Sequence, residues 1–273
     1  MNEGTKTIGL IAGGGRFPFM VAESAENKGV KVVAVAHHGE TDPALADCVD
    51  SITWIKLGQL GKLISAFKKN GVTKALMAGT ITKQKMFGRA RPDLKGLTII
   101  SKLAVFHDDG ILRAVADEFA KEGIEIISST SYLPELLAPV GCLTRKKPSR
   151  ADREDIQFGW RVAKELGRLD VGQCVVVKRK TVLALEAMDG TNKTILRGGK
   201  IAEKNAVVIK VSKPDQDLRF DVPSVGLETL ETMSRVNADV LAIEAGKTLL
   251  FDRKEMIEYA DRSGIKIVAY DKL

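Results

Sequence analysis

Short apolar runs alternate with segments of helical spacing through the first half of the chain. The runs are rich in Val, Ile and Ala with little polar alternation, which is typical of strands buried on both faces of a sheet. They predict strands at residues 7–12, 30–36, 52–57, 74–78 and 124–127. Between them the spacing predicts helices at residues 17–28, 60–70, 97–106 and 111–121. Strands that alternate with helices form a parallel sheet, so we expect a doubly wound, Rossmann-like α/β domain.

The second half predicts a different order of elements. An amphipathic helix is expected at residues 152–167, where Ile156, Trp160, Ala163 and Leu166 fall on one stripe. Strands are predicted at residues 173–177, 181–186, 206–211, 239–244 and 266–269, and helices at 226–236 and 254–262. Because tight turns such as Lys178-Arg179-Lys180 join some of these strands, we expect an α/β domain with a mixed sheet.

The boundary between the two domains is expected within residues 132–139, where two prolines disfavour regular structure. This divides the chain into residues 1–134 and 135–273. Inside the first domain, residues 83–95 are basic, contain glycine and proline and lack a clean period, which predicts a mobile loop. Such a loop can serve as a lid or as a membrane contact.

A membrane role for this loop has a direct test. Its four basic side chains that precede the expected helix are Lys83, Lys85, Arg89 and Arg91. Basic residues are attracted to anionic lipid surfaces. Neutralising all four is therefore expected to weaken association with anionic vesicles.

Composition narrows the class of protein. The 273 residues are 44% apolar and 28% charged, which is the balance of a globular protein. The net charge of +7 favours an anionic partner, and the low aromatic content of 5% argues against nucleic acid. Three widely spaced cysteines without a Cys-x-x-Cys pair indicate a reducing, cytoplasmic setting and no zinc site. No apolar run reaches the roughly 20 residues of a membrane-spanning helix, and no secretory signal is recognisable.

A glycine-rich turn between the first strand and the first helix is the first candidate site. Gly13, Gly14, Gly15 and Arg16 stand where backbone N–H groups and a helix N-terminus can meet a phosphate. Gly79 and Thr80 follow the fourth strand and join this candidate site. A dinucleotide fingerprint is disfavoured, because its third glycine is replaced by proline and the second strand ends in two histidines instead of an acid. Two interpretations remain: the turn binds a nucleotide diphosphate, or it is a tight turn without a ligand.

Acids ahead of the helix at residues 111–121 form a second candidate. In Asp108-Asp109-Gly110-Ile111-Leu112-Arg113, two carboxylates precede an arginine by about one turn. One interpretation is helix capping, with an effect of about 0.5–2 kcal/mol. The other is that Asp109 binds a metal or a sugar while Arg113 contacts a phosphate.

The most informative segment is KVSKPDQDLRFDVPSVG, which begins at Lys210. If residues 217–222 are extended, Asp217, Arg219 and Asp221 share one face and apolar residues the other. The two acids would then lie ~13 Å apart, too far to bind one ion unless the chain bends. A solvated edge strand is the alternative interpretation of the same pattern.

Further substrate-binding candidates flank this segment. Lys210 and Lys213 can serve as point charges on a phosphate, and Gln216 adds an amide beside them. Thr191 follows a strand end with two acids and a glycine, which predicts either an N-capped helix or a second anion-binding loop.

Taken together, these stretches resemble the LpxI-type UDP-2,3-diacylglucosamine pyrophosphatases of bacterial lipid A biosynthesis. The resemblance rests on GLIAGGGRFP, HDDGILR, SYLPELLAPVGCLTRKKP, DIQFGWRVAKELGRLDVGQCVVVK, LALEAMDGTN and VSKPDQDLRFDVPSVGLETL. They span nearly the whole chain in the family's order, and the last is the most specific.

The resemblance implies an activity and its residues. It implies Mg²⁺-dependent hydrolysis of UDP-2,3-diacylglucosamine to 2,3-diacylglucosamine 1-phosphate (lipid X) and UMP, with water attacking the phosphorus next to the sugar. It implies a UDP-binding domain at residues 1–134 and a lipid X-binding domain at 135–273. The essential acid of the family lies in the stretch matched by QDLRFD, so Asp221 is the first candidate and Asp217 the second, for catalysis and for the metal, with Arg219 beside them.

The resemblance also implies a cellular location, and two alternative functions remain. The lipid substrate implies a cytoplasmic protein peripheral to the inner membrane, and a homodimer is one candidate for the oligomeric state. The rival functions are a nucleotide-binding regulatory module and a nucleotide-sugar oxidoreductase. The missing acid after the second strand argues against the oxidoreductase.

Overall fold

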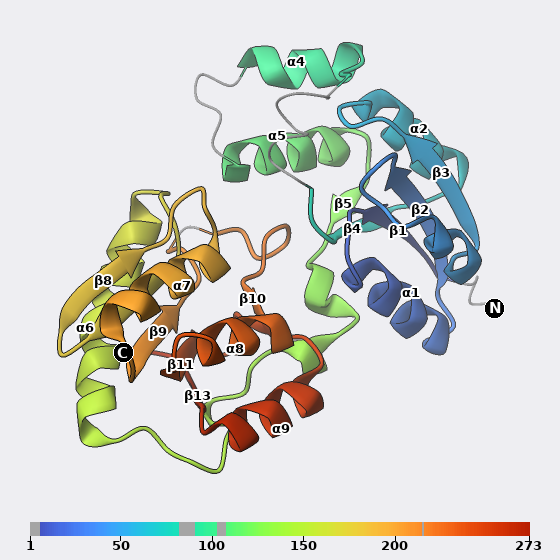
Figure 1. Ribbon diagram of the computed structural model, residues 1–273. Coiled ribbons are helices and arrows are strands. Elements are labelled where there is room, and N and C mark those ends of the chain that lie inside the picture. The colour runs from blue at the N-terminus through green and yellow to red at the C-terminus, as the bar shows by residue number, and fades with distance from the viewer. Residues whose placement is uncertain (1–5, 82–90, 103–107, 215) are drawn as a thin grey trace. The chain divides into compact units, whose positions relative to one another are not determined.

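Two units make up the computed structural model, which describes residues 6–81, 91–102, 108–214 and 216–273 (Figure 1). The N-terminal unit contains Met1–Pro134 and, in addition, Asp217–Asp221. The C-terminal unit contains Glu135–Gln216 and Val222–Leu273. The short segment Asp217–Asp221 therefore packs with the N-terminal unit, although the chain on both sides of it belongs to the other unit.

The N-terminal unit is built on a five-stranded parallel sheet in the order β3-β2-β1-β4-β5. Its strands are β1 (Thr7–Ala12), β2 (Lys31–His37), β3 (Ser51–Ile55), β4 (Lys74–Ala78) and β5 (Glu125–Ile126). The chain runs from β1 outward to β3 and then returns to β4 on the other side of β1. This is the doubly wound arrangement that the sequence predicts, and it is confirmed.

Helices cover both faces of this sheet. Those on the sheet are α1 (Phe17–Asn27), α2 (Leu60–Lys69) and α5 (Asp108–Lys121), while α4 (Leu94–Lys102) packs on α2 and α5. Short 3-10 helices lie at Pro43–Cys48 and Ser129–Ser131, and a third, Pro134–Leu136, lies at the boundary between the two units. Figure 1 shows α1 on one face and α2 with α5 on the other. The rings of Phe67 on α2 and Phe119 on α5 meet with centroids 6.1 Å apart in the core between those helices and the sheet.

Helices α4 and α5 both start three residues earlier than the sequence predicts. Residues 94–95, expected in the basic loop, are the first two residues of α4. Asp93 explains this, because its Oδ1 accepts the backbone N–H of Gly96 at 3.0 Å and so satisfies a first-turn donor. Helix α5 starts at Asp108, three residues before the predicted start. Lys83, Lys85 and the rest of residues 82–90, like residues 103–107, lie outside the described part of the chain.

A six-stranded mixed sheet forms the C-terminal unit, in the order β6-β13-β11-β9-β7-β8. The strands are β6 (Gly141–Cys142), β7 (Cys174–Lys178), β8 (Thr181–Leu185), β9 (Ala206–Lys210), β11 (Ala238–Glu244) and β13 (Lys266–Tyr270). The central strands β9, β11 and β13 are parallel, whereas β6, β7 and β8 pair antiparallel. A small parallel pair joins β10 (Ser224–Val225) to β12 (Leu249–Leu250). The predicted mixed sheet is confirmed.

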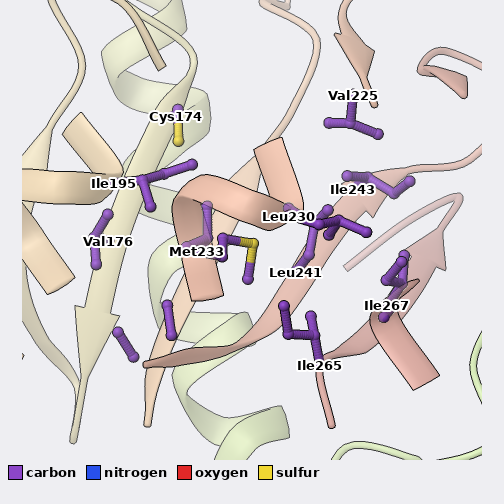
Figure 2. Packing of buried hydrophobic residues seen from close by; sticks show 14 of the residues in the cluster. Cys174, Val176, Ile195, Val225, Leu230, Met233, Leu241, Ile243, Ile265 and Ile267 are labelled. Carbon is purple, nitrogen blue, oxygen red and sulfur yellow. The ribbon is translucent and has the colours of Figure 1, made fainter. Parts of the chain in front are cut away.

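Helices again lie on both faces of the sheet. They are α6 (Arg150–Arg168), α7 (Thr191–Ala202), α8 (Leu227–Ser234) and α9 (Arg253–Ser263). The predicted stripe on α6 is buried against one face. Figure 2 shows the core on the other face, where Ile195 of α7 and Leu230 and Met233 of α8 pack over the strands.

Among the described residues, no helix is both long and apolar enough to cross a membrane.

Candidate functional site

The loops after β1 and β4 meet at the carboxyl edge of the N-terminal sheet. Strand β1 lies between β2 and β4, so the connections that follow β1 and β4 leave in opposite directions. In open α/β sheets, ligands bind at this point. The structure therefore brings the predicted residues Gly13, Gly14, Gly79 and Thr80 together at this edge of the sheet.

Backbone hydrogen bonds hold these two loops against each other. Gly13 N donates to Ala78 O at 2.8 Å, and Gly14 exchanges two bonds with Thr80 at 2.8 and 3.0 Å. A Cβ on Gly13 would lie 2.7 Å from Thr80 O, and one on Gly79, which has φ +93°, would lie 2.6 Å from Gly14 O. These glycines therefore permit the close approach of two loops. The N–H groups of Gly13 and Gly14 donate to Ala78, the last residue of β4, and to Thr80 in the loop that follows it. The phosphate-binding role of Gly13 and Gly14 stays a prediction.

The remaining candidates of this turn face outward. Gly15 has φ +87° and is exposed, and nothing lies within 4 Å of where its Cβ would be. Arg16 is the N-cap residue of α1 and makes no side-chain capping bond. Gly15 and Arg16 thus occupy the accessible side of the loop, beside a helix N-terminus that favours negative charge.

His37 supports the glycine loop from β2. Its Nδ1 lies 3.0 Å from Ala12 O, and Thr41 Oγ1 donates to the same carbonyl at 2.7 Å. Burial lowers the pKa of His37, although the bond to Ala12 and nearby Glu40 partly oppose this. The imidazole is therefore a neutral structural group whose ring N–H fixes the end of β1.

This burial predicts a pH dependence of stability. A histidine whose pKa is lowered by folding stabilises the native state fully above its unfolded pKa of about 6.5, and this contribution falls as the pH drops below that value. The slope can reach about 1.4 kcal/mol per pH unit. We expect His37→Asn to lose this slope between pH 7 and 5.

The measurement is urea unfolding in a Trp160→Phe background, where Trp54 on β3 is the remaining tryptophan and reports on the N-terminal unit. His38→Asn, at the exposed neighbouring position, is the control. Its ring lies 5.5 Å from the ring of Trp54, so the fluorescence of this variant is expected to change, but the pH slope of its unfolding free energy should be kept. Equal slopes in the parent and His37→Asn would show that His37 does not carry the effect.

Asp217–Asp221 forms a tight turn, so the prediction of an extended segment is wrong. The carbonyl oxygen of Asp217 accepts the backbone N–H groups of Phe220 at 3.0 Å and Asp221 at 3.2 Å. The Asp217 side chain also accepts the Arg219 N–H at 3.1 Å, which is an Asx-type turn. The chain therefore bends at this segment. Such a bend is needed if both acids are to contribute to one metal or substrate site.

Within the turn, Asp217 and Arg219 form a two-point ion pair. Arg219 Nε lies 2.9 Å from Asp217 Oδ1, and Nη2 lies 2.7 Å from Oδ2. The hydrogen bonds from Arg219 lower the pKa of Asp217, and the same contact raises the pKa of Arg219. Both oxygens of Asp217 are thus engaged by a guanidinium. Asp221 is half-buried at the end of the turn. The metal-binding role of Asp217 and Asp221 stays a prediction.

The turn lies at the same edge of the sheet as the glycine loops. Ser128 follows β5, the neighbour of β4, and its Oγ donates to Leu218 O at 3.4 Å. Phe220 packs against the apolar core of the N-terminal unit. Arg113, a predicted phosphate contact, is exposed on α5 and close enough to Asp217 to help lower its pKa. The side chain of Asp109 lies outside the described part.

Three predicted residues of the C-terminal unit lie around the end of β9. Lys210 is 8% exposed and its Nζ donates to Ser224 O at 2.7 Å. Lys213 pairs with Asp170, and its backbone N donates to Gln216 Oε1 at 2.9 Å. Gln216 therefore closes the turn that carries Lys213. Their roles in binding substrate stay predictions.

Thr191 occupies the first turn of α7, apart from those residues. Its hydroxyl donates to Glu186 Oε1 at 2.8 Å, and the preceding Gly190, with φ +82°, is the N-cap residue. The helix prediction for this stretch is confirmed, but no side chain caps it. A role in anion binding stays a prediction.

The sequence analysis missed a charged cluster beside β9. Glu244 ends β11, its side chain is 4% exposed, and it accepts from Lys164 at 2.6 Å, Lys247 at 2.9 Å and Ser212 N at 2.9 Å. Burial opposes ionisation of Glu244, but these hydrogen bonds outweigh it and lower its pKa. Lys164 and Glu244 are far apart in sequence, so their contact could not be predicted. The one signal in the sequence is Glu244 itself, an acid at the end of an apolar strand.

In the described ranges, no group of three or more His, Cys, Asp and Glu side chains is arranged to hold a metal ion. Mg²⁺ commonly uses one or two carboxylates together with substrate phosphates and water. Asp221 fits that use as a single carboxylate.

Comparison with known proteins identifies the family. Residues 7–136 match the LpxI N-terminal domain and residues 139–268 the LpxI C-terminal domain. The chain is also 32% identical to the UDP-2,3-diacylglucosamine pyrophosphatase LpxI of Caulobacter vibrioides over 97% of this chain and 98% of that protein. The chain belongs to the LpxI family. The resemblance inferred from the sequence motifs is confirmed.

Solved structures resemble this LpxI chain only loosely. An ADP complex of N5-carboxyaminoimidazole ribonucleotide synthetase is 14% identical with a TM-score of 0.28, covering 63% of this chain and 32% of that one. Biotin carboxylase of Campylobacter jejuni is 12% identical with a TM-score of 0.29, covering 71% and 41%. This chain thus spans less than half of these proteins, and the likeness supports no conclusion about function.

Proposed function

We propose that this LpxI chain hydrolyses the pyrophosphate bond of UDP-2,3-diacylglucosamine to lipid X and UMP, with Asp221 as the carboxylate that orients and deprotonates the attacking water. The observation that carries the substrate is family membership over both domains together with the named activity of the Caulobacter vibrioides relative. The turn that presents Asp221 at the carboxyl edge of the N-terminal sheet supports its role.

The two units are proposed to bind different parts of the substrate. In the N-terminal unit, the exposed side of the Gly13–Arg16 loop is proposed to bind the UDP phosphates, with Arg113 as a further positive charge. In the C-terminal unit, the basic residues around β9 are proposed to bind the acylated sugar phosphate. A pyrophosphate diester is anionic and resists nucleophilic attack, so its hydrolysis needs charge neutralisation and a positioned base.

Mg²⁺ is part of the proposal. When bound, it would neutralise charge on the phosphates and polarise the phosphorus–oxygen bonds. Asp221 is the proposed ligand in this chain, and the substrate phosphates and water would complete the shell. The proposal does not assign that role to Asp217, because both of its carboxylate oxygens pair with Arg219.

The test is direct. Purified protein is incubated with UDP-2,3-diacylglucosamine in detergent micelles, with Mg²⁺ or with EDTA, and UMP is quantified by chromatography. We expect UMP and lipid X in equal amounts with Mg²⁺ and a loss of turnover with EDTA. Absence of UMP under both conditions would contradict the activity, and equal rates would contradict the metal requirement.

We also propose that the protein is peripheral to the cytoplasmic face of the inner membrane and contacts it through α4. Leu94 and Leu97 are three residues apart on α4 and are 84% and 51% exposed. Leu94 follows the basic segment that ends at Arg91. Apolar side chains beside basic ones are typical of helices that lie on anionic membranes.

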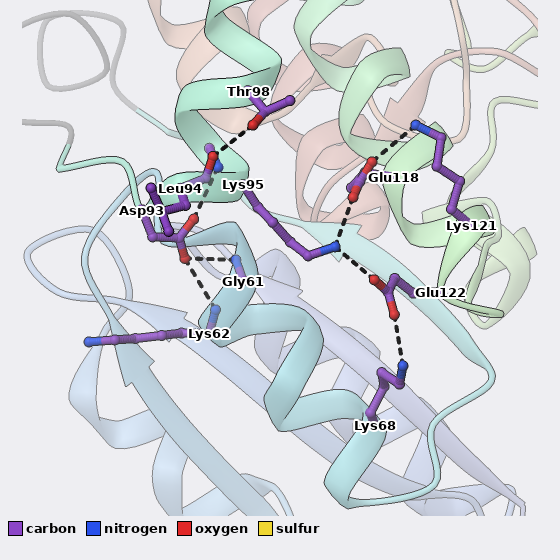
Figure 3. A network of polar contacts seen from close by, with 11 residues as sticks. Gly61, Lys62, Lys68, Asp93, Leu94, Lys95, Thr98, Glu118, Lys121 and Glu122 are labelled. Carbon is purple, nitrogen blue, oxygen red and sulfur yellow. Dashed lines mark hydrogen bonds and ion pairs between the residues drawn. The ribbon is translucent and has the colours of Figure 1, made fainter.

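Ion pairs with α5 determine which face of α4 is exposed to solvent. Figure 3 shows Lys95 between Glu118 and Glu122 of α5, at 2.8 and 2.7 Å, with Lys68 of α2 on the far side of Glu122. Hydrogen bonds from Lys68 and Lys95 lower the pKa of Glu122 to about 2, so the network stays charged at neutral pH. Lys95 thus ties one side of α4 to α5, while Leu94 and Leu97 face solvent.

The double variant Leu94→Gln, Leu97→Gln is expected to lower the fraction bound to phosphatidylglycerol-containing vesicles several-fold in a flotation assay, because about 25 cal/mol per Å² of apolar burial is lost. Ile201→Gln on α7, which replaces a 60% exposed residue of the other unit, is the matched control and should bind as wild type. Unchanged flotation of the double variant would show that α4 does not contact the membrane.

A further inference from the structure

An ion pair at the carboxyl edge of the C-terminal sheet contacts the main chain of the loop after β9. Lys164 Nζ on α6 donates to Ser212 O at 2.9 Å and to Glu244 Oε2 at 2.6 Å. The same Glu244 oxygen accepts the Ser212 N–H at 2.9 Å. One ion pair, at the ends of β9 and β11, therefore binds both main-chain polar groups of Ser212.

Buried hydrogen bonds couple Ser212 to the residue that follows it. Ser212 Oγ lies 3.1 Å from Gln216 Oε1, which also accepts the Lys213 N–H at 2.9 Å. The Gln216 N–H donates in turn to Lys213 O at 3.1 Å. Because Ser212 and Gln216 are both buried, these bonds are shielded from water. The position of Ser212 therefore determines that of Lys213.

The end of α6 fixes Lys213 from a second direction. Gly167 lies three residues after Lys164 on this helix, and a Cβ on it would lie 3.1 Å from Lys213 Cα and 3.2 Å from Pro214 Cδ. Asp170, which follows the helix, pairs with the Lys213 ammonium. Contacts along one stretch of α6 thus place both the main chain and the side chain of Lys213.

This arrangement suits the recognition of a phosphate. A lysine binds phosphate as a point charge on a flexible stem, so ordering the stem in advance lowers the entropic cost of binding. The Lys213 side chain is 15% exposed, so it is held in place while part of it still meets solvent. Strands β9 and β11 are parallel, and ligands of α/β sheets bind outside the carboxyl ends of such strands.

We propose that Lys164, Gly167 and Glu244 are positioning residues, which hold the loop after β9 so that Lys213 is pre-organised for the phosphate of the acylated sugar. The inference rests on the proposed function, because it takes Lys213 as a ligand of that phosphate. It gives three residues that do not themselves contact the substrate a share in its affinity.

The test measures the affinity of the full-length chain for lipid X in detergent micelles and for UMP, both by calorimetry, together with kcat and KM for UDP-2,3-diacylglucosamine. Lys164→Met is the principal variant. Lys164→Arg is its conservative counterpart, because a guanidinium can donate to the same two acceptors. Gly167→Ala tests the close approach of the loop without removing a charge.

The matched control is Lys266→Met, in the same unit. Lys266 Nζ donates to Asp152 at 2.8 Å and to Asp239 at 3.0 Å, and its side chain is 17% exposed, compared with 26% for Lys164. Asp239 and Lys266 stand at the starts of β11 and β13, which is the opposite edge of the sheet. The control therefore breaks a similar ion pair far from the loop after β9.

We expect Lys164→Met to raise both the Kd for lipid X and KM about tenfold, the usual size for losing hydrogen bonds to a charged group. The kcat should stay unchanged, because an interaction made equally with substrate and transition state alters KM alone. Affinity for UMP should also be unchanged. Lys164→Arg should recover most of the affinity, Gly167→Ala should raise KM several-fold, and Lys266→Met should keep wild-type constants.

Wild-type affinity for lipid X in both Lys164→Met and Gly167→Ala would overturn the proposal. Equal losses in Lys164→Met and Lys266→Met would overturn it as well, because affinity would then follow the stability of the unit. Turnover by wild type separates the two levels. A wild type that forms no UMP contradicts the proposed function, whereas an active wild type with unaffected variants contradicts the positioning role alone.

Discussion

Asp221→Ala is expected to fold and to bind UDP-2,3-diacylglucosamine but to turn it over at least ~10²-fold more slowly than wild type, the usual size of a general-base contribution. The backbone N–H of Asp221 makes the bond that closes the turn, and alanine retains it. The loss should therefore appear in kcat, while binding, measured by calorimetry with substrate micelles, changes little.

The matched control is Asp271→Ala, which removes an exposed carboxylate near the C-terminus. It should leave kcat unchanged. Near-wild-type turnover by Asp221→Ala would move the chemistry to another residue. A variant that neither binds substrate nor shows the wild-type circular dichroism spectrum would contradict the expectation that Asp221 is dispensable for the fold.

Glu244→Ala is expected to have the largest effect on stability, a loss of about 3–5 kcal/mol in the free energy of unfolding of the C-terminal unit. The variant leaves Lys164 without its carboxylate partner and removes the acceptor of the buried Ser212 N–H. Because Ser212 also donates to Gln216, the loop that carries Lys213 should loosen as well.

Urea unfolding in a Trp54→Phe background measures this effect, since Trp160 on α6 is then the remaining tryptophan and lies in the C-terminal unit. Glu255→Ala, at an exposed acid of α9, is the control and should change stability by less than about 0.5 kcal/mol. A loss of under about 1 kcal/mol in Glu244→Ala would show that the cluster is not structurally important.

The same residue predicts acid sensitivity. A carboxylate whose pKa is lowered by folding stabilises the native state above its unfolded pKa, near 4.3, and that contribution is lost as the pH falls through the lower folded value. Hydrogen bonds from Lys164 and Lys247 keep the pKa of Glu244 low despite its burial. Wild type should therefore lose stability below about pH 4 more steeply than Glu244→Gln, as read by the same fluorescence.

The sequence predicts the sheets well because their strands are continuous apolar runs. Strands β1 and β4 match their predicted limits, and the stripe on α6 is buried as expected. The predicted hairpin at Lys178–Lys180 is confirmed by positive φ angles at Arg179 and Lys180. Asp155 fixes it by accepting both of their N–H groups at 2.8 and 2.6 Å, a contact that only the fold shows.

The site was harder to predict, since its geometry depends on contacts distant in sequence. Alternating polar and apolar residues at 217–222 predict a strand, but the Asp217 side chain and the burial of Phe220 favour a turn. The apolar core that Phe220 joins is formed by residues far earlier in the chain. Likewise, the glycines of the β1 loop predict a phosphate site from the sequence, whereas their close approach to the loop after β4 is seen only in the structure.

The most direct test of the account is a single-turnover reaction of wild type and Asp221→Asn with UDP-2,3-diacylglucosamine in ¹⁸O-labelled water, with both products analysed by mass spectrometry. We predict that wild type forms UMP without label and lipid X with one ¹⁸O in its phosphate, and that Asp221→Asn forms at least ~10²-fold less of both in the same time. Equal product from the two proteins would contradict the role of Asp221, and label in UMP would contradict attack at the phosphorus next to the sugar.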